Sequence, residues 1–124
     1  MSLLSAASSQ HAYDERRGEG RRPLFGKARL IIERQIVSGR TLDVSISGLA
    51  VVADINPPLG LSCVVEFSLP GQNGLLQMLE LQATVLNTVL TRDGFRIGLK
   101  FDAPSARTRQ LLQNYVEIPQ ANRP

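Results

Sequence analysis

The chain has 124 residues, enough for one domain with a single hydrophobic core and too few for two. Hydrophobic residues make up 43% of it and the formal net charge is +3, so we expect a folded protein. The single cysteine, Cys63, and the single histidine, His11, exclude an internal disulfide and a cysteine–histidine zinc site within one chain. Because the sequence has no secretory signal and no apolar run near the roughly 18 residues of a membrane helix, we expect a cytoplasmic protein that is not inserted into a membrane.

The positive charge is concentrated near the N-terminus. Four of the twelve arginines lie within residues 16–22, whereas lysine occurs only at positions 27 and 100. Arginine is favoured over lysine where planar, two-pronged hydrogen bonding or stacking matters. We therefore expect a local anion site and not a broad basic surface.

The N-terminal residues are predicted to lack regular structure. Residues 1–12 are small and polar, which is typical of a disordered tail. Residues 13–24 form an arginine-rich arm, expected to be flexible because Gly18 and Gly20 disfavour a helix. The arm opens a single predicted domain, residues 13–118.

Residues 25–102 alternate between apolar and polar side chains, which is the pattern of strands with one buried face. The alternation covers residues 27–33, 41–46, 61–68, 79–85 and 95–101, and a sixth strand is expected over roughly 48–54. Turn residues separate these segments at Ser38–Gly39, Asn56–Pro58, Pro70–Gly74 and Arg92–Gly94. Six short, regularly spaced strands predict a small antiparallel barrel.

One helix is predicted after the strands, over residues 105–117. Ser105 is a suitable N-cap, and apolar side chains recur at helical spacing until Pro119 ends the pattern. We expect this amphipathic helix to pack on the barrel or to close its mouth.

Asp43 and Ser45 form the second polar feature of the sequence. If residues 42, 44 and 46 face the core, both polar side chains emerge on the outer face of their strand, about 7 Å apart. Gly48 follows, and it either permits a bulge or a positive φ, or leaves room for a ligand to approach the backbone.

These residue types suit a guanine nucleotide with two phosphates. A carboxylate such as Asp43 can accept hydrogen bonds from the N1–H and N2–H₂ groups of guanine, and an arginine fork can donate to O6 and N7 or to phosphate oxygens. Arg17 and Arg21 are therefore expected to fold over the barrel and to bind the base or the phosphates.

The combination of RxxxR at residues 17–21 and DxSxxG at residues 43–48 resembles the paired signature of the PilZ domain, a bacterial receptor for the second messenger cyclic di-GMP. The resemblance extends over residues 16–116. It implies a mainly β protein with a six-stranded antiparallel Greek-key barrel, one C-terminal helix and a flexible N-terminal arm. It also implies a receptor without catalytic activity.

The resemblance assigns the ligand-binding residues, which are Arg16, Arg17, Arg21, Asp43, Ser45 and Gly48. An arginine at the position of Arg16 accompanies binding of a stacked pair of ligands in family members, so two cyclic di-GMP molecules per chain are expected. Arg22 and Arg96 are auxiliary candidates. No metal and no cofactor besides the ligand are expected.

By the same resemblance, ligand binding reorders the N-terminal arm and is relayed to a protein partner. The outputs found in the family include motility, exopolysaccharide production and the surface attachment that leads to biofilm. We expect a monomer or a weak dimer.

Two alternatives from other classes remain open. A small-barrel nucleic-acid binder would need exposed aromatic side chains, and the sequence has only four Phe and two Tyr. A degenerate PilZ-like module would bind a protein and no nucleotide. An enzyme is not expected, because the sequence offers no paired carboxylates, no nucleophile with a base and no phosphate-binding loop. Cys63 is expected to be a buried structural thiol, and His11 is given no role.

Overall fold

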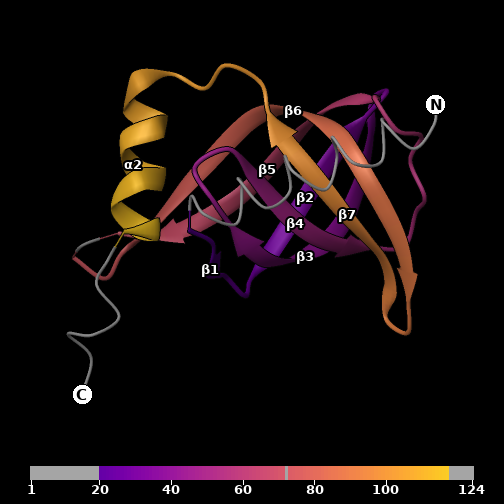
Figure 1. The fold of residues 1–124 in the computed structure, drawn as a ribbon, viewed down its shortest axis with the longest axis horizontal. Coiled ribbons are helices and arrows are strands. Elements are labelled where there is room, and N and C mark those ends of the chain that lie inside the picture. Colours follow the sequence, from indigo (N-terminus) through magenta and orange to yellow (C-terminus); the bar gives the residue numbers. More distant parts are fainter. Residues whose placement is uncertain (1–19, 72, 118–124) are drawn as a thin grey trace, which may run out of the picture.

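The computed structural model of the chain describes residues 20–71 and 73–117. The predicted tail, residues 1–12, and the two arginines Arg16 and Arg17 lie outside these ranges. Within them, the chain forms a strongly curved antiparallel sheet with a single helix at one end (Figure 1).

The strands close into a barrel. In chain order they are β1 (Arg22–Pro23), β2 (Lys27–Ile32), β3 (Gln35–Val44), β4 (Gly48–Ala53), β5 (Ser62–Pro70), β6 (Leu76–Thr91) and β7 (Gly94–Phe101), followed by helix α2 (Ala106–Val116). The strand order is β1-β3-β2-β5-β6-β7-β4, and a further pairing of β3 with β4 closes the ring. Within the described residues, the expected six-stranded barrel is therefore confirmed, with β1 as an additional short strand on β3.

Strand β3 organises the N-terminal half because it has three partners. Residues 35–40 pair with β2, and residues 39–44 pair with β4 on the other edge, with a bulge between Thr41 and Asp43. The two residues of β1 continue the β2 edge of β3, with Arg22 opposite Val44 and Pro23 opposite Asp43. The end of the predicted arm is thus part of the sheet.

The turn predicted at Ser38–Gly39 is wrong. Both residues lie inside β3, and the chain reverses earlier, at Glu33 and Arg34, whose φ values of 51° and 75° are those of a tight hairpin turn. Gly39 is a glycine for a different reason: a Cβ on it would lie 2.7 Å from the carbonyl oxygen of Val52 on β4. Close approach of two strands, and not a turn, requires the small residue.

The hydrophobic core fills the barrel. The inward residues of the predicted strands at 79–85 and 95–101 are buried or half-buried as expected, and the rings of Phe67 and Phe101 stack with centroids 6.0 Å apart. Strand β6 runs beyond its predicted end at residue 85 as far as Thr91, forming a long hairpin with β7.

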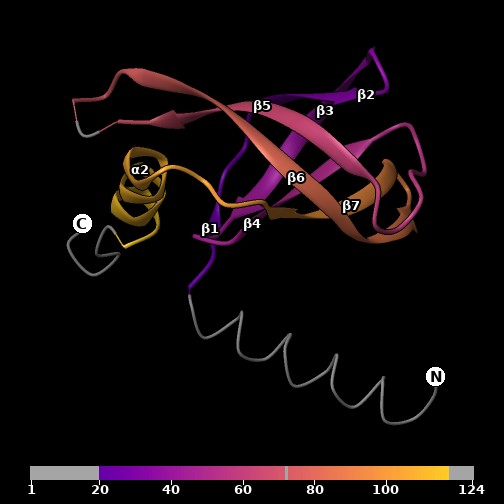
Figure 2. The ribbon, with the colours of Figure 1, turned by 90° about the horizontal axis from the view of Figure 1, so that it is seen from above.

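Helix α2 packs at one end of the barrel, next to the β5–β6 hairpin (Figure 2). Its start is as predicted, because the Ser105 hydroxyl accepts the backbone N–H of Thr108 at 3.1 Å. Leu112 and Tyr115 are the buried side chains of the helix. Among the described residues there is no helix with the length and apolar character needed to span a membrane.

The packing of α2 predicts that Leu112→Ala destabilises the protein. Leu112 is fully buried, so its truncation leaves a cavity, and we expect the free energy of unfolding to fall by about 2–5 kcal/mol. Denaturant unfolding measures this effect. Arg107→Ala, an exposed substitution on the same helix, is the control and should change stability little. Equal stability of the two variants would show that α2 is not docked as described.

Candidate functional site

Arg21 and Asp43 form a hydrogen-bonded ion pair at the surface of the barrel. The Nη2 and Nε atoms of Arg21 donate to the same Asp43 oxygen, Oδ1, at 2.6 and 2.9 Å. The side chains are 29% and 24% exposed, so the pair is accessible to a ligand and also partly shielded from water. Two residues that the sequence assigned to one site are therefore in direct contact.

A second arginine approaches the same carboxylate from β7. The Nη2 atom of Arg96 lies 3.8 Å from Asp43 Oδ2, an ion-pair distance that is too long for a hydrogen bond. Arg21, Asp43 and Arg96 together form what we call the arginine–aspartate cluster. It contains two guanidinium groups and one carboxylate, so it carries an excess positive charge that favours an anion.

The backbone around β1 holds Arg21 in place. The Leu24 N–H donates to the carbonyl of Leu42 at 2.9 Å, and the buried Thr41 hydroxyl donates to the carbonyl of Leu24 at 2.6 Å. Arg21 therefore enters the cluster from a segment that is already fixed against β3. The alternation over residues 41–46 puts Thr41 on the outer face, opposite to residues 42, 44 and 46. The bulge before Asp43 instead lets both Thr41 and Val44 face inward.

Ser45 lies beside Asp43 as predicted, because both contact the Arg21 guanidinium, but the prediction that it is exposed on the outer face is wrong. Ser45 lies just beyond the end of β3 and is fully buried. Its hydroxyl accepts the backbone N–H groups of Ser47 and Gly48 at 3.2 and 3.1 Å, a local turn interaction, and Arg21 Nη1 approaches it at 3.4 Å. Ser45 thus stabilises the turn between β3 and β4 and contacts the Arg21 guanidinium of the cluster.

Gly48 is required by the packing of neighbouring strands. It opens β4 opposite Lys100 of β7, and a Cβ at this position would collide with the carbonyl oxygen of Leu99. Its φ is not among the positive values found for glycines in the described part of the chain. The structure therefore shows neither the positive φ nor the bulge that were expected at Gly48. The backbone that approaches this residue closely belongs to β7.

Arg22 lies on the other side of β1 from Arg21 and contacts helix α2. Its Nη1 donates to the carbonyl of Tyr115 at 2.9 Å, and its guanidinium carbon lies 4.3 Å from the centroid of the Tyr115 ring. The Tyr115 hydroxyl in turn donates to the carbonyl of Pro23 at 2.9 Å, and burial raises the pKa of this phenol. The auxiliary candidate Arg22 is thus placed against the helix, whereas Arg96 is placed beside Asp43.

Sequence reasoning missed the contact between Arg22 and Tyr115. The two residues are 93 positions apart, and the helical spacing of Tyr115 indicated only that it faces the core. Within residues 20–71 and 73–117, no group of three or more His, Cys, Asp or Glu side chains could hold a metal ion.

The described residues thus form a small closed antiparallel β-barrel with a C-terminal helix, in which an arginine of the N-terminal segment pairs with an aspartate of β3. The family model of the PilZ domain matches residues 15–117. The chain belongs to the PilZ domain family.

Solved structures agree with this assignment of the fold. The inhibitor of motility of Bacillus subtilis (MotI/DgrA) superposes with a TM-score of 0.72 at 19% identity, covering 85% of this chain and 52% of that one. This chain thus spans about half the length of that protein. The PilZ domain of YcgR from Escherichia coli, solved with c-di-GMP, gives a TM-score of 0.56 at 17% identity and coverages of 78% and 84%. No curated protein matches the sequence.

The packing at Gly48 predicts that Gly48→Ala destabilises the barrel. The added methyl group would meet the β7 backbone, which cannot yield as a side chain does, so a loss of about 1–3 kcal/mol in unfolding free energy is expected. Gly26→Ala is the matched control, because its Cβ would lie 3.9 Å from Thr41 Oγ1, an ordinary contact. A Gly48→Ala variant as stable as Gly26→Ala in denaturant unfolding would contradict this role.

The environment of Cys63 predicts a thiol that is unreactive in the native protein. Cys63 is buried, and burial followed by the negative charge of Asp102 raises its pKa, so little thiolate forms near neutral pH. Iodoacetamide should modify it only after denaturation, as mass spectrometry would show. Equal rates of modification in native and denatured protein would mean that the thiol is accessible and ionised.

Proposed function

We propose that the chain is a cytoplasmic, non-enzymatic receptor for cyclic di-GMP that relays ligand binding to a protein partner. The observation that carries this proposal is the arginine–aspartate cluster, in which residues from both motifs meet on the surface of a PilZ barrel. The PilZ domain of YcgR, solved with c-di-GMP, supports the choice of ligand.

The geometry of the cluster is suited to a guanine base. Both hydrogen bonds from Arg21 to Asp43 end on Oδ1, and Arg96 is 3.8 Å from Oδ2. Oδ2 can therefore accept an N–H of the base while the Arg21–Asp43 pair stays intact. The Arg21 guanidinium plane is then free to stack on the purine, and Arg96 is close enough to meet phosphate oxygens.

The remaining predicted ligand residues fit the proposal as follows. Arg16 and Arg17 precede Arg21 by five and four residues, and we propose that they supply further phosphate and base contacts. Arg16 would allow a second, stacked ligand molecule. Ser45 and Gly48 would act mainly by shaping the turn that presents Asp43.

We place the relay at β1. Arg21 belongs to the arginine–aspartate cluster, while the adjacent Arg22 donates a hydrogen bond to the α2 backbone at Tyr115. Reordering of the arm on ligand binding would therefore act next to a contact that connects the arm to the C-terminal helix. Control of motility is the output supported by the Bacillus subtilis neighbour, an inhibitor of motility; biofilm formation is a second candidate. The proposed state is a monomer or a weak dimer.

The nucleic-acid alternative receives little support from the aromatic side chains. In the described ranges, Phe67 and Phe101 are buried, Phe95 is half-buried and Phe25 alone is largely exposed. A surface for stacking several successive bases needs more than one such ring. The degenerate PilZ-like module is distinguished from a receptor by direct measurement of ligand binding.

Calorimetric titration with cyclic di-GMP tests the proposal, with cyclic di-AMP and GTP as competing ligands. We expect binding of cyclic di-GMP alone. Arg21→Ala removes the guanidinium proposed to stack on the purine, a contact of about 1–3 kcal/mol, and leaves Asp43 without the partner that orients its carboxylate. Affinity should therefore fall about a hundredfold or more, to the point where heat is no longer detected.

Two further variants sharpen this measurement. Arg21→Lys keeps the charge but loses the planar fork, and should also lose most of the affinity. Arg107→Ala on α2 should bind as the wild type does. Arg16→Ala should lower the molar ratio from two ligands per chain to one. Undiminished affinity of Arg21→Ala, or a preference for cyclic di-AMP, would contradict the proposed site.

A further inference from the structure

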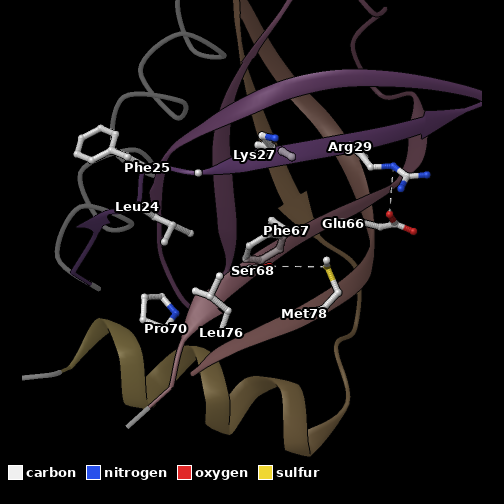
Figure 3. Close-up of a pocket in the computed structure, with 12 residues that line it drawn as sticks. Leu24, Phe25, Lys27, Arg29, Glu66, Phe67, Ser68, Pro70, Leu76 and Met78 are labelled. Carbon is white, nitrogen blue, oxygen red and sulfur yellow. Dashed lines mark hydrogen bonds and ion pairs between the residues drawn. The ribbon is translucent and has the colours of Figure 1, made fainter. Parts of the chain in front are cut away.

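A hollow of about 420 Å³ opens on the outer surface of the barrel beside β2 (Figure 3). The pairing of β2 with β5 ends at Ala28 and Phe67, and β5 continues to Pro70 while the chain before β2 turns toward β3. The two strands therefore separate, and their divergence creates the hollow. None of its lining residues belongs to the arginine–aspartate cluster.

The hollow is lined mainly by apolar side chains, and we call it the apolar groove. Its floor contains the buried side chains of Leu24, Ala28 and Phe67. Its walls contain Phe25 and Leu76, which are 79% and 72% exposed, together with Met78 and Pro70. Contiguous exposed patches of large apolar side chains are uncommon on monomeric proteins and often mark an interaction site.

The charges beside the groove indicate what binds there. Arg29 is engaged by Glu66 at 3.5 Å, whereas Lys27 makes no ion pair within the described ranges of the chain (Figure 3). One ammonium group thus lies beside the apolar walls and can receive a carboxylate. The volume lies within the range of about 300–1,000 Å³ that is usual for binding pockets.

A protein segment fits these features better than a membrane does. The surface is hollowed, so its shape suits the protruding side chains of a protein segment. Glu80, which is exposed on β6 opposite Glu66 and has no ion pair within the described ranges, would also repel anionic headgroups.

We propose that the apolar groove is the docking site for a protein partner, and that the partner contributes a short segment with apolar anchor side chains and a carboxylate that pairs with Lys27. The inference rests on the proposed function for its relay role, because that role requires a partner. The segment that carries Arg21 also carries Leu24 and Phe25, so a partner in the groove lies alongside the ligand-binding arm.

The experiment uses the full chain as bait for a phage-displayed library of random peptides. Selected peptides are synthesised, and their affinity for purified variants is measured by fluorescence anisotropy. Leu76→Ser removes a groove wall, and Leu90→Ser on the β6–β7 hairpin is the matched control, because the two leucines are 72% and 70% exposed. Lys27→Glu reverses the charge at the rim.

We expect the selected peptides to combine apolar and acidic residues. Their affinity should fall about tenfold or more in Leu76→Ser and in Lys27→Glu, and should be unchanged in Leu90→Ser. The proposal is overturned if no peptide binds, if peptides bind Leu76→Ser as tightly as the wild type, or if Lys27→Glu binds them equally well.

Two further measurements test whether the groove binds lipid or a second copy of the chain instead. If the protein sediments with vesicles that contain anionic phospholipid, and Leu76→Ser but not Leu90→Ser abolishes this, the groove binds lipid. A dimer seen by analytical ultracentrifugation and dissociated only by Leu76→Ser would assign it to a second copy of the chain. Either result overturns the proposal of a different protein partner.

Titration of Leu76→Ser with cyclic di-GMP separates this inference from the proposed function. The variant should bind the nucleotide with wild-type affinity, because Leu76 is remote in the sheet order from β3 and β1. A wild-type protein that binds the peptides but not cyclic di-GMP would refute the receptor and leave the groove standing. A wild-type protein that binds cyclic di-GMP but not the peptides would refute the docking site and leave the receptor standing.

Discussion

The two-residue pairing of β1 with the end of β3 is the interaction on which the candidate site depends. It places Pro23 opposite Asp43 and Arg22 opposite Val44. Because successive side chains of an extended segment point to opposite sides, Arg21 reaches Asp43 while Arg22 reaches Tyr115 on α2. A single short pairing therefore connects the candidate ligand site with the C-terminal helix, and the buried hydrogen bond from Thr41 to Leu24 fixes it.

The DxSxxG motif divides into one residue that a ligand can reach and two that build its support. Asp43 presents a carboxylate at the surface, whereas Ser45 is buried in the turn between β3 and β4 and Gly48 is buried at the start of β4. The Ser45 hydroxyl accepts the backbone N–H groups of Ser47 and Gly48, and so stabilises the turn that presents Asp43. Of the three motif residues, only Asp43 exposes its side chain at the candidate site, and the other two support the backbone around it.

The sequence predicted those parts of the fold that depend on local patterns. Strict alternation located the buried faces of β6 and β7, and Ser105 located the start of α2. The errors occurred where a distant strand decided the outcome. Gly39 looks like a turn residue but makes room for the carbonyl of Val52, and the bulge at Thr41 changes which side chains face inward. The contact between Arg22 and Tyr115 leaves no local signal, since only the closed barrel brings them together.

The stiffness of the segment between Arg21 and β2 constrains how a partner could sense the ligand. Leu24 is buried and hydrogen-bonded through both its N–H and its carbonyl, and the Gly26 carbonyl accepts the N–H of Thr41. The side of the apolar groove that contains Leu24 is therefore formed in the structure without ligand. A ligand changes a partner's affinity only through contacts that differ between the two states. We expect such contacts to come from the ligand itself or from the part of the arm that precedes Gly20.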